Sequence, residues 1–324
     1  MEPSFTVKFS PDDRVVLSGH FDGTIVGYDV STGSNKFEFN VTPRDVRSKV
    51  PVTSVAFRPG GGKPILLVAC SNGTVDRWEL RSLERASTIK EDGNEVYAAA
   101  YRSDGGLFAT AGRDAHLRVY DDTTGSLIHN LPTAGDVSVN PAAVRLYSVV
   151  FPKDDPNLVM TCGWGKTIHI FDMRQPDSIS GHTEVFGPYL AGDAMDVAPD
   201  VILTASQRVD DRLQLWDRTT LKPTEIKWPT KHEFLPQCAR FSNDAGAEYF
   251  AVGGSGASGD DKEGAFVYDR RNAKLVVDAS FEKGINTCAF ANRDNIVAFG
   301  DGEGQIHLFE SKKPSTTNNT SGTQ

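Results

Sequence analysis

The stretch Leu213-Gln214-Leu215-Trp216-Asp217 has the form of a short β-strand that ends in an aromatic residue followed by an acid. The same ending recurs at intervals of 41 to 52 residues along the 324-residue chain. A pattern that returns at such a period indicates a repeat architecture, in which each copy forms one supersecondary unit. The copies are Tyr28-Asp29, Trp78-Glu79, Tyr120-Asp121, Phe171-Asp172, Trp216-Asp217, Tyr268-Asp269 and Phe309-Glu310.

Each repeat contains strand-like segments that we call strands a to d. In the first repeat these are residues 5–9, 15–19, 24–29 and 35–40. Asp22-Gly23, between strands b and c, is a strong signal for a tight hairpin. The same order returns in the other repeats, and no stretch shows a sustained helical period. The sequence therefore predicts an all-β fold.

Strands a and b are mostly continuous apolar runs, such as Ile65 to Cys70 and Leu158 to Cys162. Such runs are typical of sheets that are buried on both faces. The segments Asp22 to Asp29 and Arg212 to Asp217 resemble the strand-c signature of WD-repeat proteins. The resemblance covers residues 4–310 and implies a seven-bladed β-propeller of four-stranded antiparallel blades, a ring that leaves only short sheet edges exposed. The aromatic residue that ends each strand c is then expected to form a wedge between neighbouring sheets.

The sequence departs from the WD-repeat pattern at two points. The Gly-His pair that the family places before strand a is missing from nearly every repeat, and Gly181-His182 is the nearest match. We therefore expect the family's buried network of Asp, His, Ser and Trp side chains to be incomplete. After Glu310, either residues 311–317 supply a weak fourth strand or the ring closes on three strands. The predicted domains are a propeller over residues 1–313 and a disordered tail over residues 314–324.

The composition is that of a folded, soluble chain, with 39% hydrophobic and 24% charged residues. No run approaches the roughly 18 apolar residues that a membrane-spanning helix needs, and residues 1–10 lack the features of a secretion signal. Acidic residues number 43 against 34 basic ones, a formal charge of -9 that disfavours nucleic acid as the default partner. These features predict a cytoplasmic or nuclear protein that is not secreted, is not bound to a membrane and is monomeric on its own.

No catalytic or metal-binding motif is evident in the sequence. Gly163-Trp164-Gly165-Lys166-Thr167 ends like a phosphate-binding loop, but Met160 stands where the first glycine should be. His232-Glu233 is not followed by a histidine at the spacing of a metalloprotease. The sequence therefore predicts no enzymatic activity, no cofactor, no metal and no small-molecule substrate. Cysteines within apolar strand-like runs are predicted to be buried structural residues in a reducing compartment; they are Cys70, Cys162, Cys238 and Cys288.

The loops at the ends of the propeller are better candidates for binding. In the WD-repeat family, the residues that open strand a and those of the b–c hairpin lie on one face, the top. Repeats three and four carry Tyr, Trp and Arg there, the residue types that dominate interface hot spots. We therefore predict a non-enzymatic scaffold that binds protein partners within a multiprotein complex; the alternative is that these aromatics only cap the channel. The predicted binding residues are Tyr97, Arg113, Arg145, Tyr147, Trp164 and Phe21. A Tyr147→Ala variant is expected to lose its partners without a change in melting temperature.

A second hypothesis comes from three segments in which an arginine follows two residues after the acid that ends strand c; they are Trp78-Glu79-Leu80-Arg81, Phe171-Asp172-Met173-Arg174 and Tyr268-Asp269-Arg270-Arg271. These segments resemble the aromatic-Asp-x-Arg box of WD-repeat substrate receptors. Those receptors dock onto the adaptor of a cullin-type ubiquitin ligase, and the resemblance implies the same role here. The boxes lie in alternate repeats rather than in consecutive ones, and their arginines have a simpler interpretation as partners of neighbouring loops on the bottom face. The residues predicted to dock the adaptor are Arg81, Arg174 and Arg271.

Overall fold

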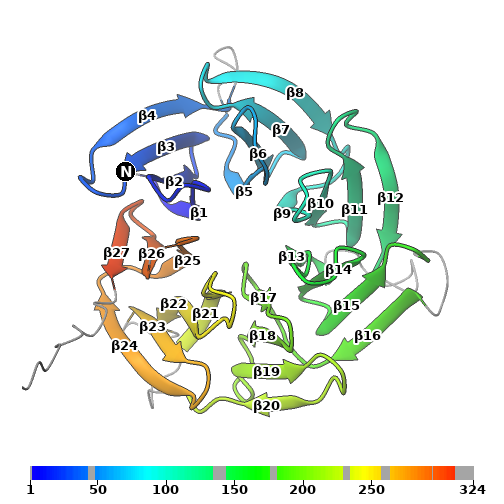
Figure 1. The fold of residues 1–324 in the computed structure, drawn as a ribbon, viewed down its shortest axis with the longest axis vertical. Helices are drawn as coiled ribbons and strands as arrows, with labels where there is room; N and C mark the ends of the chain where they lie inside the picture. The colour runs from blue at the N-terminus through cyan, green and yellow to red at the C-terminus, as the bar shows by residue number, and fades with distance from the viewer. Residues whose placement is uncertain are drawn as a thin grey trace, which may run out of the picture.

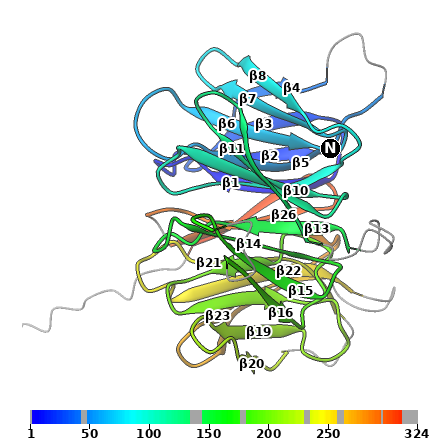
Figure 2. The same cartoon turned by 90° about the vertical axis from the view of Figure 1, so that its right-hand side faces the viewer.

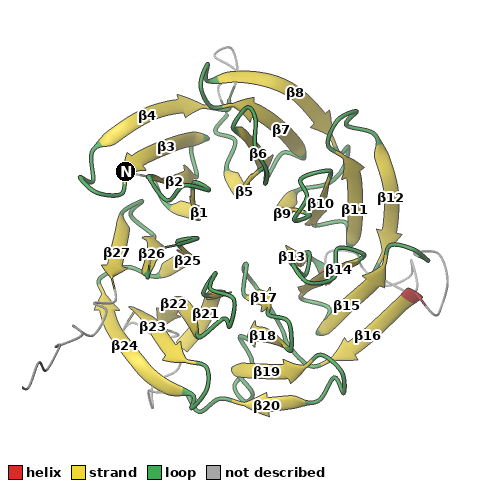
Figure 3. Cartoon of the chain, viewed as in Figure 1, coloured by secondary structure: helices red, strands yellow, loops and turns green. Residues whose placement is uncertain are grey.

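The strands of this chain form a ring of separate sheets around a central axis (Figure 1). Figure 2 shows the same ring from its edge. Nearly all of the described chain is strand or loop (Figure 3), and none of its helices is long and apolar enough to cross a membrane. The seven antiparallel sheets found among the described residues confirm the predicted seven-bladed all-β propeller. The computed structural model describes residues 2–42, 48–133, 144–175, 181–228, 234–256, 263–293 and 295–310.

The sheets follow one another in chain order and are called blades one to seven. Blade one consists of β1 (Ser4–Phe9), β2 (Val15–His20), β3 (Thr24–Asp29) and β4 (Asn35–Asn40). Blade two consists of β5 (Val52–Phe57), β6 (Ile65–Cys70), β7 (Thr74–Glu79) and β8 (Glu84–Lys90). Blade three consists of β9 (Val96–Tyr101), β10 (Leu107–Gly112), β11 (His116–Asp121) and β12 (Leu127–Pro132). Blade four consists of β13 (Leu146–Val150), β14 (Leu158–Gly163), β15 (Thr167–Asp172) and β16 (His182–Phe186).

The remaining blades have the same order. Blade five consists of β17 (Met195–Val197), β18 (Val201–Ala205), β19 (Leu213–Asp217) and β20 (Pro223–Glu225). Blade six consists of β21 (Phe234–Phe241), β22 (Tyr249–Gly256), β23 (Glu263–Asp269) and β24 (Lys274–Phe281). Blade seven has three strands among the described residues, β25 (Ile285–Phe290), β26 (Ile296–Asp301) and β27 (Ile306–Glu310). The predicted tail over residues 314–324 and the weak strand over 311–317 lie outside the described residues.

The depth of each strand in its blade explains its sequence. The first strand of every blade lines the axis (Figure 1), and the second is packed between neighbouring sheets. All five residues of β18 are buried, as are the last five of β6, so both strands read as unbroken apolar runs. The outermost strand β24 alternates exposed and half-buried residues, because only one of its faces meets the core.

The aromatic residues that end the third strands are wedges between blades, as the sequence predicted. Trp216 lies opposite Ile202 on β18 and donates a hydrogen bond from Nε1 to Thr204 Oγ1 at 2.8 Å. Its ring also packs on Gly187, where an added Cβ would lie 2.5 Å from Trp216 Cη2. The wedges Trp78, Tyr120, Phe171, Trp216 and Tyr268 are buried, whereas Tyr28 and Phe309 are half-buried. The two less buried wedges belong to blades one and seven, on either side of the ring closure.

Blade three contains a buried polar network that is built on a carboxylate. Glu91 precedes β9, in the segment where WD repeats carry the Gly-His pair. Its Oε1 accepts hydrogen bonds from Thr110 Oγ1 at 2.5 Å and from the Tyr120 hydroxyl at 3.0 Å. Arg118 Nη1 lies 3.2 Å from Oε2 and supplies the compensating charge. A charged pair therefore holds this blade where the family pattern would place a histidine.

The ring closes through side chains and apolar packing between blades one and seven. Asp13, in the turn between β1 and β2, accepts hydrogen bonds from the backbone N–H of Asn292 at 2.8 Å and of Arg293 at 2.7 Å. On the axis side, the Val7 N–H donates to Thr287 Oγ1 at 3.1 Å. β1 and β27 belong to different sheets. Among the described residues, then, no strand is shared across the closure.

Candidate protein-binding face

The first strands of blades three and four place two predicted residues against each other. Tyr97 follows the first residue of β9 and Tyr147 follows the first residue of β13. Because both occupy the same position in adjacent blades, their rings stack with centroids 4.8 Å apart and planes 9° apart. Trp164, which directly follows β14, lies 5.6 Å from Tyr147. All three side chains are half-buried, so each keeps part of its surface open to solvent.

Tyr189 extends this arrangement, and the sequence prediction missed it. Its ring stacks on Trp164 at 6.1 Å with an interplanar angle of 12°, and its N–H donates to Ser206 Oγ at 3.0 Å. Tyr189 lies in the connection between blades four and five, where no strand period fixes which way a side chain points. We call this continuous series of ring contacts the aromatic row; it consists of Tyr97, Tyr147, Trp164 and Tyr189, and its middle pair is tilted by 45°.

Two predicted arginines accompany the aromatic row. The guanidinium carbon of Arg145 lies 4.8 Å from the centre of the Trp164 ring, a cation–π contact. Arg113 Nη1 pairs with Glu95 Oε1 at 2.7 Å, and Glu95 also accepts the hydroxyl hydrogen bond of Tyr97. Glu95 thereby fixes one end of the row, and sequence reasoning missed it too. Glu95 directly precedes β9 and stands two residues before Tyr97, and this spacing is the signal that was available.

Electrostatic shifts follow from these contacts. The hydrogen bond from Tyr97 is the main cause that lowers the pKa of Glu95, with Arg113 adding to it. Burial, and then the bond to Glu95, raises the pKa of the Tyr97 hydroxyl. The hydrogen bond with Tyr147 raises the pKa of Arg145. The face therefore places the Glu95 carboxylate beside the guanidinium groups of Arg113 and Arg145 and the rings of the tyrosines.

Phe21 lies apart from the aromatic row, in blade one. It packs edge-on against Phe5 with ring centroids 6.1 Å apart, and Lys49 Nζ lies 5.9 Å from its ring centre. Its side chain is exposed. The structure thus brings together five of the six predicted top-face residues and leaves Phe21 with a separate pair of neighbours.

The three predicted docking arginines follow the C-terminal ends of β7, β15 and β23. The b–c hairpins, one of which carries Trp164, lie at the N-terminal ends of these strands. Arg174 forms a two-pronged ion pair with Asp172 of its own box, with Nη2 at 2.6 Å from Oδ2. Arg271 is paired with Glu248. The backbone N–H of Arg81 donates to Glu79 at 3.1 Å. All three side chains are exposed, and two of them are bound to acids of the same blade.

The axis of the ring contains a group of charged side chains. Arg240 on β21 pairs with Asp193, which precedes β17, and Ser148 Oγ on β13 donates to the other Asp193 oxygen at 2.8 Å. Arg240 Nη1 also donates to the carbonyl of Met195 at 2.7 Å. A cavity of 270 Å³ on the axis is lined by Arg240 and by Lys8 of β1. These contacts join blades four, five and six.

Seven antiparallel sheets arranged as blades around one axis define a β-propeller. The family described as "WD domain, G-beta repeat" matches residues 5–29 and 84–121. A solved structure, the β-propeller domain of Myceliophteria thermophila Cps50 (Swd1), aligns over 96% of this chain and 98% of that chain with a TM-score of 0.76 and 17% identity. Two stretches of the chain thus match the WD-repeat family model, and the whole described chain has the fold of a seven-bladed β-propeller.

Curated relatives match parts of the chain. Autophagy-related protein 18 of Saccharomyces cerevisiae is 33% identical over 115 residues, which cover 35% of this chain and 21% of that protein. Serine-threonine kinase receptor-associated protein of Gallus gallus is 26% identical over 186 residues, which cover 55% of this chain and 47% of that protein. The chain thus spans less than half the length of these relatives.

Proposed function

We propose that this chain is a non-enzymatic scaffold that binds protein partners through the aromatic row and its arginines. The observation that carries the proposal is the continuous series of ring contacts from Tyr97 to Tyr189, accompanied by Arg113 and Arg145. Tyr, Trp and Arg contribute most of the binding energy in typical protein interfaces. WD-repeat propellers commonly provide such rigid platforms, and the match of two stretches of this chain to the WD-repeat family model supports the proposal.

The geometry of the row favours binding over simple capping of the channel. Each ring is held by a neighbour, and Tyr97 is further held by Glu95, so little side-chain freedom is lost when a partner binds. The rings remain half-buried rather than buried, and Arg113 is exposed at the end of the row. A surface that is rigid before binding and carries fixed charges is suited to the selection of a partner.

The proposal is tested by affinity purification of partners followed by quantitative mass spectrometry. Arg113→Ala removes an exposed side chain and leaves the stack intact, so recovery of true partners should fall about tenfold at an unchanged melting temperature. Tyr147→Ala should lower recovery further. Tyr147 also contacts two other rings, and each contact contributes about 1 kcal/mol to stability. The melting temperature of Tyr147→Ala is therefore measured as well, so that a loss of stability is recognised.

Arg174→Ala is the matched control, because it removes an exposed arginine from the other end of the blades. This variant should recover the same partners as the wild type. Undiminished recovery of the same partners by both Arg113→Ala and Tyr147→Ala would contradict the proposal. Partners that disappear only in Arg174→Ala would instead support docking to a ubiquitin-ligase adaptor through the box arginines.

A further inference from the structure

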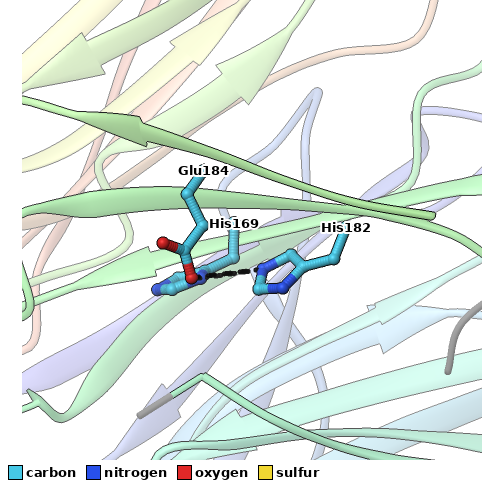
Figure 4. A group of neighbouring side chains, drawn as sticks. All are labelled: His169, His182 and Glu184. Carbon is cyan, nitrogen blue, oxygen red and sulfur yellow. Dashed lines mark hydrogen bonds and ion pairs between the residues drawn. The ribbon is translucent and has the colours of Figure 1, made fainter. Parts of the chain in front are cut away.

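Blade four carries two histidines and a glutamate that the strand register brings to one point. His169 on β15 lies directly opposite Glu184 on β16. His182 is two residues before Glu184, and alternate residues of a strand point to the same side. All three side chains therefore project from the same face of the sheet, and Figure 4 shows their polar ends turned toward one another.

The distances among the three polar ends fit a metal ion better than hydrogen bonds. His169 Nδ1 lies 3.1 Å from His182 Nε2, and Glu184 Oε1 lies 3.5 Å from the first nitrogen and 3.7 Å from the second. Bonds of about 2.0–2.1 Å in a tetrahedral zinc site place neighbouring ligand atoms about 3.3 Å apart. A hydrogen bond between the two rings accounts for one of the three distances only, since Glu184 is too far for a good hydrogen bond to either nitrogen.

The surroundings hold this geometry and leave room for a further ligand. His169 is buried, and the His182 ring is stacked on Phe171 at 4.1 Å with an angle of 9°. A cavity of 180 Å³ borders His169 and Glu184 and is also lined by Thr167. That volume is enough for water molecules, so a metal held by the three side chains would keep an open position.

We propose that His169, His182 and Glu184 bind a divalent transition metal of the zinc class, with water completing the coordination. Imidazole nitrogen together with carboxylate oxygen suits zinc, whereas magnesium and calcium prefer oxygen ligands alone. The metal would connect β15 to the outermost strand β16 and so stabilise blade four. The site is separate from the aromatic row and does not depend on the proposed scaffold function.

The experiment uses the full chain without a histidine tag, treated with chelator and titrated with zinc chloride in a calorimeter. The wild type should bind one zinc ion per chain, raise its melting temperature with zinc, and show the intense visible absorption of low-coordinate cobalt when cobalt replaces zinc. Glu184→Gln keeps the size of this exposed side chain but replaces its carboxylate by a neutral amide, which is a weaker ligand for zinc. Zinc affinity should fall about tenfold or more in this variant and in His182→Gln.

His129→Gln is the matched control, because His129 lies on β12, the strand of blade three that corresponds to β16. This variant should bind zinc like the wild type. Absence of zinc binding by the wild type would overturn the proposal, and so would equal affinity in Glu184→Gln. Because Glu184 is exposed, that variant is expected to fold, which keeps the test decisive even if His182→Gln is unstable.

Discussion

At the scale of single residues, the buried thiols illustrate how burial controls reactivity. Cys70 and Cys162 lie in the second strands of their blades, and burial raises the pKa of each thiol to about 12. At pH 8 only about one thiol in ten thousand would then be ionised, and the thiolate is the reactive form. Cys238 and Cys288 are buried as well.

We therefore predict that the native chain reacts very slowly with a thiol-specific chromogenic reagent at pH 8. In denaturant, where the thiols recover ordinary pKa values, the four cysteines should react within the mixing time of an ordinary assay. Rapid modification of one thiol per native chain would contradict the burial of these residues. The burial itself was predicted from the sequence and is confirmed.

The residue-scale features that were predicted depend on local sequence, and those that were missed depend on contacts across strands. The ending at Trp216 was interpreted correctly because the wedge position recurs in every repeat. Tyr189 was missed because it lies in a connection without a period. His169 and Glu184 were missed because their proximity follows from the register of β15 and β16, which a single strand does not reveal.

At the scale of elements, the turn between β1 and β2 joins the two ends of the ring. Asp13 is buried and adopts a positive φ of 60°, a conformation that Asp tolerates better than most residues. Its carboxylate accepts hydrogen bonds from the backbone of Asn292 and Arg293 and from the Asn292 side chain at 2.8 Å. These bonds connect the first blade to the last.

Asp13→Ala should consequently lower the free energy of unfolding by about 1–3 kcal/mol, because it removes the charged acceptor of three part-buried hydrogen bonds. The neighbouring Asp12→Ala is the control: Asp12 is exposed and accepts a local bond from Ser10 Oγ at 2.6 Å, so its loss should cost about 1 kcal/mol or less. Urea unfolding curves of both variants give the comparison. Equal stability of the two would show that Asp13 does not help to close the ring.

Strand positions were predictable because turn residues and apolar runs are local signals. The predicted 24–29 and 35–40 coincide with β3 and β4. The hydrogen-bond partners of a turn residue such as Asp13 were not predictable, since Asn292 is 279 residues away in the sequence. The axis-side bond from Val7 to Thr287 recurs between other blades, from Val55 to Thr6 and from Ala99 to Ser54. The bonds of Asp13, by contrast, depend on two turns that lie far apart in the sequence, and a single repeat does not reveal them.

At the scale of the whole molecule, the ring depends on interactions at its axis as well as between neighbouring sheets. Sevenfold repetition predicted the ring, but it did not predict the charged group formed by Lys8, Asp193 and Arg240, because these residues differ from repeat to repeat. Asp193 contacts Ser148 of blade four and Arg240 of blade six, and it precedes the first strand of blade five. One carboxylate thus joins three consecutive blades.

The contribution of the Asp193 charge to the axis can be tested by measuring the free energy of unfolding at low pH. Burial alone would raise the pKa of Asp193, but Arg240 and Lys8 outweigh it, so that the pKa lies below the ordinary value of 3.8. A carboxyl whose pKa is lower in the folded state contributes stability above pH 3.8, and this contribution is lost as the pH falls through the folded-state pKa. Asp193→Asn should therefore be less stable than the wild type at pH 7, by about 1–2 kcal/mol after allowance for partial solvent exposure.

That difference in unfolding free energy should shrink as the pH falls below about 4 and nearly vanish in stronger acid, where the wild-type carboxyl is also neutral. Denaturant unfolding at a series of pH values measures it. Asp210→Asn is the control, because Asp210 is exposed and lies 3.9 Å from Arg208, and its difference from the wild type should stay within about 0.5 kcal/mol throughout. A stability difference for Asp193→Asn that does not change with pH would mean that this side chain joins blades four to six by its shape and hydrogen bonds rather than by its charge.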